Sequence, residues 1–167
     1  TTYGLVGYCR LQRGEWASAL QAYRMAQLSQ PDSNQWKAGV AQCLQNLDAR
    51  IEAVAMLDEV IRQTPEEASY AMLQASMLIE LDRNDEAVKA LDLPRRLGRL
   101  DPDGLLLLAD LHVRAKRIAA AEGLVDEAFG EEEKPGEDRV LSTVASAMRA
   151  ETWKLADQLI VKASPEE

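Results

Sequence analysis

A repeat of 34 residues runs through this chain of 167 residues and limits its possible folds more than any other feature. The clearest marker is alanine, which returns at this interval at Ala19, Ala53, Ala87 and Ala121. A second series of small residues keeps the same interval at Gly7, Ala41, Ala75 and Ala109. Within one period, apolar residues lie three or four positions apart, as at Trp16, Tyr23 and Ala26, which places them on one helical face. The sequence therefore predicts a pair of helices that is repeated along the chain.

The first period carries a recognisable set of residues. It has an aromatic residue, an apolar and small pair, a turn, two alanines that flank an aromatic residue, and a proline, at Tyr3, Val6-Gly7, Gly14-Glu15-Trp16, Ala19, Tyr23, Ala26 and Pro31. In these positions, and in its period, the chain resembles the tetratricopeptide repeat family over nearly its whole length. It departs from the family pattern at Arg10, where an aromatic residue is usual, and at Pro94, where a small residue is usual.

The resemblance implies an all-α fold. The expected architecture is a right-handed superhelical solenoid of about five antiparallel helix-turn-helix hairpins, because a single hairpin cannot bury its apolar face alone. The repeats are expected at about residues 1–32, 33–66, 67–100, 101–134 and 135–167, within one helical-repeat domain. We expect this domain to be a fragment of a longer chain.

Prolines mark several expected boundaries. Thr64-Pro65 and Asp101-Pro102 each combine a capping side chain with a proline suited to the first position of a helix. Pro94 falls inside an expected helix, so that helix is predicted to kink or to end near Asp92. The acidic loop at residues 130–138 is expected to hold a one-residue insertion, because the frame of the last repeat is moved by one residue.

Charge and composition exclude two classes of partner. The net charge is -9, whereas nucleic-acid binding needs clustered Lys and Arg, so no nucleic-acid partner is expected. The longest aliphatic run covers residues 105–109, which is too short to cross a bilayer, so no membrane insertion is expected. The compartment stays open between cytoplasm and cell envelope.

The residues that carry chemistry are sparse. His112 is the only histidine and occupies a slot that holds Leu44 and Leu78 in other repeats, so we interpret it as a hydrogen-bonded interior residue. The carboxylates at residues 131–133 are interpreted as a solvated loop rather than a cation site. The sequence has no phosphate loop, nucleophile elbow or zinc motif. We therefore expect no catalytic residue, no metal site, no cofactor and no enzymatic activity.

The two cysteines share one slot of the repeat. Cys9 and Cys43 are followed at the same interval by Met77 and Leu111, so the slot is interpreted as an apolar packing position, and Leu5 is also expected to face inward. Equivalent helices of stacked hairpins lie about 8–10 Å apart, beyond the reach of a disulfide, so both thiols are expected to be free.

A small basic cluster stands out in this acidic chain. Arg95, Arg96 and Arg99 follow Pro94. One interpretation is a helix end whose arginines complement the helix dipole and pair with Asp101 or Asp103. The other is a contact for an acidic partner.

The resemblance also implies where a partner binds, since in this family the first helix of each hairpin lines a concave groove. The positions of these helices that do not face the core are the candidate partner-binding residues: Tyr8, Leu11, Gln35, Gln42, Gln45, Asn46, Met72, Ser76, Ile79, Asp110 and Arg114. Amide side chains offer both donors and acceptors to a peptide backbone, and Met and Ile can receive apolar side chains.

One known ligand class of the family is disfavoured. The carboxylate clamp that the family uses on chaperone C-termini needs Lys, Arg and Asn, but this chain has Gly4, Tyr8, Gly39, Ser69 and Leu73 in those places. The predicted function is thus a non-enzymatic interaction module that binds a protein or peptide partner in its groove. The alternative is an architectural element that self-associates within a larger complex.

Overall fold

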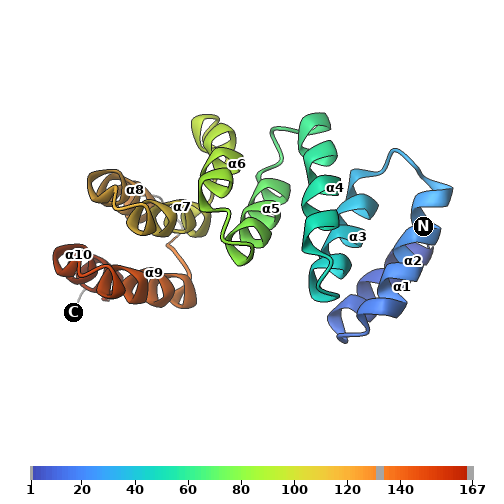
Figure 1. Cartoon of the computed structure of the whole chain (residues 1–167), viewed down its shortest axis with the longest axis horizontal. Helices are drawn as coiled ribbons and strands as arrows, with labels where there is room; N and C mark the ends of the chain where they lie inside the picture. Colours follow the sequence, from blue (N-terminus) through green and yellow to red (C-terminus); the bar gives the residue numbers. More distant parts are fainter. Residues whose placement is uncertain (1, 131–133, 165–167) are drawn as a thin grey trace. The chain divides into compact units, whose positions relative to one another are not determined.

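The computed structural model describes residues 2–130 and 134–164, and every regular element in them is an α-helix (Figure 1). These helices are α1 (Thr2–Gln12), α2 (Trp16–Ser29), α3 (Asn34–Asn46), α4 (Arg50–Gln63), α5 (Ala68–Glu80), α6 (Asn84–Arg96), α7 (Pro102–Arg114), α8 (Ile118–Gly130), α9 (Glu137–Arg149) and α10 (Trp153–Ala163). The predicted all-α fold is confirmed. In the described ranges, no helix combines the length and the apolar character that a membrane span requires.

The chain divides into two compact units, Thr1–Arg83 and Asn84–Glu167, called here the N-terminal unit and the C-terminal unit. In the N-terminal unit, α1 packs with α2 and α3 packs with α4, while α2 also lies against α3 and α4 against α5. In the C-terminal unit, α7 packs with α8 and α9 packs with α10. The two helices of the third expected repeat, α5 and α6, belong to different units.

The turn between the two helices of each hairpin is built in the same way throughout. One residue adopts a left-handed conformation, with φ between 57° and 74°, at Gly14, Asp48, Asp82, Lys116 and Glu151. The next residue then donates its backbone N–H to a carbonyl five positions earlier, for example Glu15 to Arg10 at 2.9 Å and Thr152 to Ala147 at 2.9 Å. The left-handed residues are spaced by 34, 34, 34 and 35 residues. The predicted one-residue insertion before the last hairpin is therefore confirmed.

The repeating alanines lie where the helices of a hairpin cross. Ala19, Ala53, Ala87 and Ala121 are fully buried, and Ala156 takes the same position in the last hairpin after the insertion. A methyl group at the crossing lets the two helix backbones approach closely, and a larger side chain would push them apart. The alanine period thus sets the hairpin geometry in both units.

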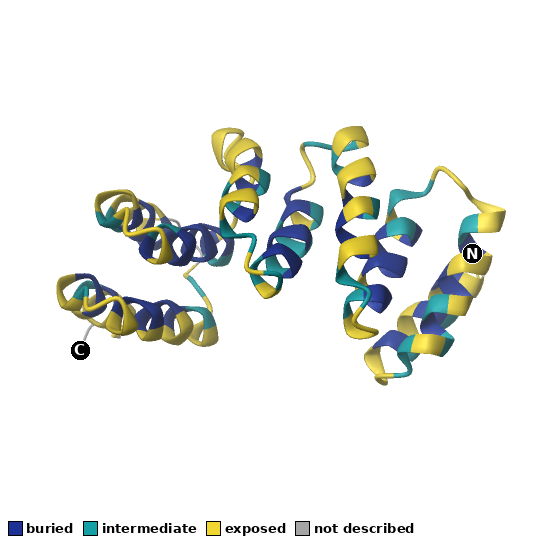
Figure 2. Cartoon of the chain, in the orientation of Figure 1, coloured by how far each residue is buried: buried dark blue, intermediate teal, exposed yellow. Residues whose placement is uncertain are grey.

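The first helices of the C-terminal unit pack directly on one another. Helix α9 lies along α7, and α8 contacts α10 (Figure 1). Figure 2 shows α7 dark blue along most of its length, because the leucines at 105–108 are all buried. Polar pairs link α8 to α10 on the outside: Lys154 donates to Glu122 at 3.0 Å and Gln158 donates to Asp126 at 2.7 Å.

Pro94 does not end its helix, so of the two predicted outcomes, a kink or an end near Asp92, the end is wrong. Helix α6 runs through Pro94 to Arg96, and the left-handed Gly98 follows. Pro94 lies in the last turn, so it removes one hydrogen bond near the helix end, and its ring is buried like the equivalent Val60. Burial of the ring offsets part of that loss.

The two proline-marked helix starts differ. Asp101 caps α7 as predicted, since its Oδ1 accepts the N–H of Gly104 at 2.7 Å and Pro102 occupies the first helical position. The prediction for Thr64-Pro65 was wrong, because α5 begins only at Ala68. The hydroxyl of Thr64 instead donates to the carbonyl of Val60 at 3.0 Å, at the end of α4.

The cysteine slot is buried in three repeats and open in the first. Both thiols are free as predicted, and Cys43 is fully buried, which raises the pKa of its thiol to about 11. Cys9 and Leu5, predicted to face inward, are exposed. The reason is that α2 covers this slot on α3, and no helix among the described residues covers the corresponding side of α1. The carboxylates at 131–133 lie outside the described residues, so the interpretation of that loop stays a prediction.

Candidate functional site

A hollow of about 450 Å³ opens on the N-terminal unit, on the side formed by the first helices of its hairpins. Helices α1, α3 and α5 supply nearly all of its lining, and α2 adds one aromatic ring. The lining residues are Gly4, Leu5, Tyr8, Tyr23, Gln35, Trp36, Ala38, Gly39, Gln42, Ser69, Tyr70 and Leu73. We call this feature the aromatic hollow, because four of these side chains are tyrosine or tryptophan.

Three glycines let two aromatic rings lie directly on helix backbones. A Cβ on Gly4 would lie 2.3 Å from the ring of Trp36, so that ring occupies the space above α1 that a side chain would fill. A Cβ on Gly7 or Gly39 would lie 2.9 Å or 2.7 Å from the ring of Tyr23. Tyr23 is therefore held between the backbones of α1 and α3. Glycine is required here for close approach rather than for backbone flexibility.

The two held rings form a rigid floor. Tyr23 and Trp36 have ring centroids 6.3 Å apart and an interplanar angle of 31°, a tilted arrangement within the range that aromatic pairs favour. Trp36 Nε1 donates to Gln30 Oε1 at 2.9 Å, which fixes the orientation of the indole. Burial raises the pKa of Tyr23 to about 12, so its hydroxyl stays protonated at neutral pH.

The walls of the hollow are polar but uncharged. Tyr8 is 56% exposed, Gln35 and Gln42 are exposed, and Tyr70 is half-buried. All five positions at which the family's carboxylate clamp places charged or amide side chains line this hollow, but here they are glycine, tyrosine, serine and leucine. The site thus lies where that clamp would be, with the chemistry for a different ligand.

The structure brings together three of the predicted partner-binding residues, Tyr8, Gln35 and Gln42, in the aromatic hollow. Leu11 is buried and contributes to the core. Met72 and Ile79 are half-buried on α5.

The other predicted polar residues of this unit are held by bonds within the protein. Gln45 Nε2 donates to Glu80 Oε1 at 2.8 Å, and Arg50 also donates to Glu80. Asn46 Nδ2 donates to the carbonyl of Gln42 at 2.8 Å, and Ser76 Oγ donates to the carbonyl of Leu73 at 2.8 Å. These groups are less free to bind a partner than the amides of the hollow.

The two predicted residues of the C-terminal unit do not form a groove. Asp110 is only 4% exposed, because α9 packs on α7, and its Oδ2 accepts a hydrogen bond from Arg114 Nε at 3.0 Å. Its other oxygen is buried with no partner among the described residues. A second hollow, of about 860 Å³, lies elsewhere in this unit, between the end of α8, the start of α9 and the end of α10.

Sequence reasoning missed Trp36, Tyr70 and the role of Tyr23 in this site. A signal for Trp36 and Tyr23 was present, since Gly4, Gly7 and Gly39 fall in helices at positions where these two rings pack. An unexplained helical glycine beside an aromatic residue of a neighbouring helix indicates that a ring lies on the backbone.

The remaining candidates for chemistry are isolated. Nδ1 of His112 is buried without a hydrogen-bond partner among the described residues, which corrects the prediction of a hydrogen-bonded histidine. Burial and the charges of Arg117 and Arg95 lower the pKa of His112. In the described parts of the chain, no group of three or more His, Cys, Asp or Glu could hold a metal ion.

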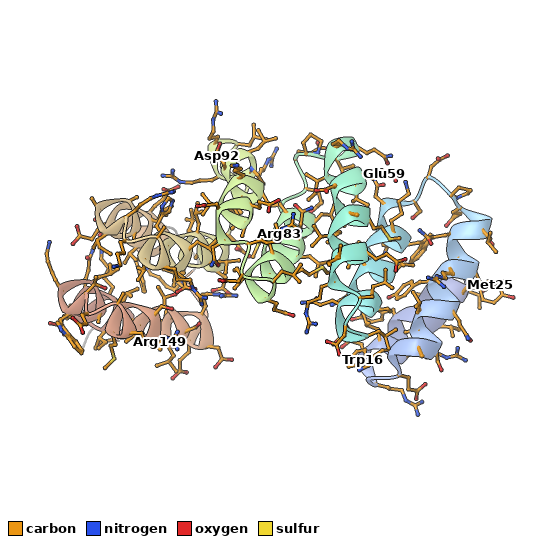
Figure 3. The ribbon with its side chains drawn as sticks, viewed as in Figure 1. Trp16, Met25, Glu59, Arg83, Asp92 and Arg149 are labelled. Atoms are coloured by element: carbon orange, nitrogen blue, oxygen red, sulfur yellow. The ribbon has the colours of Figure 1, made fainter. Side chains whose placement is uncertain are left out.

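The basic cluster pairs differently from the prediction. Arg95 Nη2 donates to Glu127 at 3.1 Å, and Arg96 lies 3.9 Å from Asp92, which is labelled in Figure 3. The two predicted partners are used elsewhere, because Asp101 caps α7 and Asp103 accepts the N–H of Gly136 at 2.7 Å. A contact with an acidic partner stays a prediction.

Comparison with family models finds a match over part of the chain. A family model for the tetratricopeptide repeat matches residues 52–98, from α4 to the turn after α6. A comparison with curated protein sequences finds no match.

Solved structures agree with this fold. MamA from Desulfovibrio magneticus RS-1 matches with a TM-score of 0.73 at 16% identity, over 96% of this chain and 90% of that chain. PilF of Pseudomonas aeruginosa matches with a TM-score of 0.77 at 18% identity, over 99% and 77%. YrrB, described as a tetratricopeptide repeat protein with an unusual peptide-binding site, matches with a TM-score of 0.66 at 15% identity, over 96% and 82%. At such identities the likeness establishes the fold alone.

Proposed function

Because this chain carries tetratricopeptide repeats, we propose that it is a non-enzymatic interaction module and that the aromatic hollow of its N-terminal unit binds an extended peptide of a partner protein. The observation that carries the proposal is the hollow itself. It joins a rigid floor of two aromatic rings to exposed amide and hydroxyl groups on α1 and α3. An apolar floor with a few polar groups around it is the usual composition of a ligand site.

The groups around the hollow suit a peptide backbone. Gln35 and Gln42 each offer donors and an acceptor, and Tyr8 offers a hydroxyl. Leu73 and Tyr70, which are half-buried in the lining, can contact an apolar side chain while these groups bond to the neighbouring peptide units. Because an extended peptide loses conformational freedom when it binds, the affinity is expected to be about micromolar.

The test is a selection from a random peptide library displayed on phage, with the purified 167-residue chain as bait. The peptides obtained are then measured against the double variant Tyr8→Glu with Gln42→Glu. The control is Ile51→Glu, which adds a charge at an exposed apolar residue on α4. We expect binding to be lost in the double variant and kept in the control. Peptides that bind the double variant as well as the wild type would place the binding surface elsewhere.

A second candidate function is self-association through the ends of the helix array. Leu5 on α1 is 68% exposed, and Ile160 and Val161 on α10 are also exposed apolar residues. The positions equivalent to Cys9, beside Leu5, are buried in the next three repeats. Light scattering over a concentration series tests this candidate. A monomer at every concentration removes it, and a mass that rises with concentration and falls back in Val161→Glu supports it.

A further inference from the structure

We propose that the occupant of the aromatic hollow is a proline-rich segment in the polyproline II conformation, with a basic residue beside the prolines. This inference rests on the proposed function and specifies its ligand. Three properties of the hollow carry it: the accessible rings of Tyr8 and Tyr70, the unused hydrogen-bond donors and the distribution of charge.

Two tyrosine rings at the sides of the hollow offer apolar surfaces of the kind against which prolyl rings pack, since Tyr8 is 56% exposed and Tyr70 is half-buried. The rings of Tyr23 and Trp36 lie against glycine backbones, are only 4% and 9% exposed, and close the bottom of the hollow. Grooves lined by aromatic residues are the general means of recognising polyproline II segments, whose conformation is already formed before binding. A ligand that is already extended loses less conformational entropy on a rigid floor.

The unused donors match the free carbonyls of such a segment. A polyproline II helix has no internal hydrogen bonds, so its carbonyl groups are open to donors. The side chains of Tyr8, Gln35, Gln42 and Tyr70 can all donate. None of these side chains donates to an acceptor within the described residues, whereas Trp36 and Ser69 are already bonded to Gln30 and Glu67. The donors around the hollow therefore outnumber the acceptors that the protein supplies.

Charge favours a basic residue beside the prolines. None of the twelve lining residues is charged, so the hollow itself selects an uncharged segment. Glu67 lies at its edge, where it accepts a hydrogen bond from Ser69 at 2.9 Å and raises the pKa of Tyr70 after the larger effect of burial. The N-terminal unit carries ten acidic and seven basic side chains. The faces of the aromatic rings also attract cations.

The experiment measures four fluorescein-labelled synthetic peptides by anisotropy against the whole chain. The first holds ten prolines followed by arginine. The second replaces every other proline by alanine, the third replaces arginine by glutamate, and the fourth has leucine and phenylalanine in place of the prolines. Each is also measured against Tyr8→Ala, with Ile51→Ala on α4 as the control, and circular dichroism checks that both variants keep the helical fold.

We expect the proline peptide to bind about tenfold more tightly than the alanine peptide, a difference of about 1.4 kcal/mol in binding free energy. The glutamate peptide should bind less tightly than the arginine peptide at low salt, and Tyr8→Ala should weaken the proline peptide while Ile51→Ala does not. Equal affinity of the proline and alanine peptides overturns the inference.

The fourth peptide distinguishes a failure of the proline-rich ligand from a failure of the proposed peptide-binding function. If it binds in a manner sensitive to Tyr8→Ala while the proline peptide does not bind, the hollow is a peptide site of another specificity and only the inference is wrong. If no peptide binds, and the library selection also yields none, the proposed function is wrong as well.

Discussion

The two units use equivalent positions of the repeat in opposite ways. In the N-terminal unit, α1, α3 and α5 contact one another only slightly, and their shared side opens into the aromatic hollow. In the C-terminal unit, α9 lies directly on α7. Position by position, the exposed Tyr8 and Gln42 correspond to the buried Asp110. The same 34-residue pattern therefore gives a surface in one unit and a core in the other.

A hydrogen bond between α7 and α9 accompanies this difference. Gly136, which precedes α9, donates its N–H to Asp103 in the first turn of α7 at 2.7 Å. The bond joins the beginnings of these two first helices. The repeat pattern therefore specifies which residues of a hairpin face each other, but not which helix the next hairpin covers.

The largest expected effect on stability comes from truncating the same repeat position in the two units, where it is buried in one and half-buried in the other. Leu106→Ala removes a fully buried side chain between α7 and its neighbours and should lower the free energy of unfolding by about 3 kcal/mol. Met72→Ala, at the equivalent half-buried position of the N-terminal unit, should cost about 1 kcal/mol. Urea unfolding followed by circular dichroism measures both. Equal losses would show that the two positions do not differ as the structure has them.

Replacing glycine by alanine should lower the stability at one position and raise it at another. In Gly39→Ala the new Cβ lies 2.7 Å from the ring of Tyr23, so overpacking should destabilise the protein by about 1 kcal/mol even after the gain in helix propensity. In Gly123→Ala, on α8, the new Cβ meets no atom within 4 Å, and stability should rise by about 0.5–1 kcal/mol. Thermal unfolding of the two variants decides, and a gain in Gly39→Ala would show that Tyr23 is not held as described.

The hairpin turns should respond equally in the two units, because their geometry is the same. Lys116→Gly relieves a left-handed residue in the C-terminal unit and should raise the free energy of unfolding by about 0.5–1 kcal/mol. Gly14→Ala introduces the same strain in the N-terminal unit and should cost about 1 kcal/mol. Chemical unfolding tests both. A loss in Lys116→Gly would mean that the lysine side chain contributes more than the backbone strain costs.

A pH effect should be confined to the C-terminal unit, which holds the only histidine. Burial and the nearby arginines lower the pKa of His112 in the folded state, so the unfolded chain binds this proton more readily. The stability that neutral His112 permits is present above about pH 6.5, the unfolded value, and is lost as the pH falls through the folded value. In His112→Leu the fall in stability between pH 7.5 and 5.5 should be smaller than in the wild type. Identical pH profiles would contradict the shift.

The smallest effect is expected for the ion pairs on the outside of the C-terminal unit. Lys154 is 86% exposed and pairs with Glu122, so Lys154→Ala should change the free energy of unfolding by less than about 0.5 kcal/mol. A larger loss that disappears in 1 M salt would show that the pairs between α8 and α10 act as a network.

Much of the fold could be predicted from the sequence because small residues recur at a constant interval and mark the repeat. Alanine at helix crossings and the frame shift of the last hairpin both follow from spacing alone. The errors arose where one residue has two possible structural roles. Thr64 could start the next helix or end the previous one, and Pro94 could break a helix or sit harmlessly in its last turn.

The candidate site was less predictable from the sequence. The repeat pattern indicates on which side of its helix a residue lies, but not which neighbouring helix covers that side. Tyr8, Gln35 and Gln42 were found since they point away from the hairpin core. Trp36 was missed because its place depends on Gly4, which belongs to another repeat. Asp110 has the same frame position as Gln42, and only the packing of α9 on α7 buries it.

The different exposure of the two cysteines provides a measure of local unfolding in the N-terminal unit. Cys9 reacts with a thiol reagent as an exposed group, while Cys43 is shielded and also has a raised pKa. Opening of α3 exposes Cys43 and returns its thiol to ordinary reactivity. The ratio of the two labelling rates, read by mass spectrometry on the unaltered chain, therefore reports how often α3 opens. Since α3 carries Trp36, a ligand that occupies the aromatic hollow should slow the second rate and leave the first unchanged.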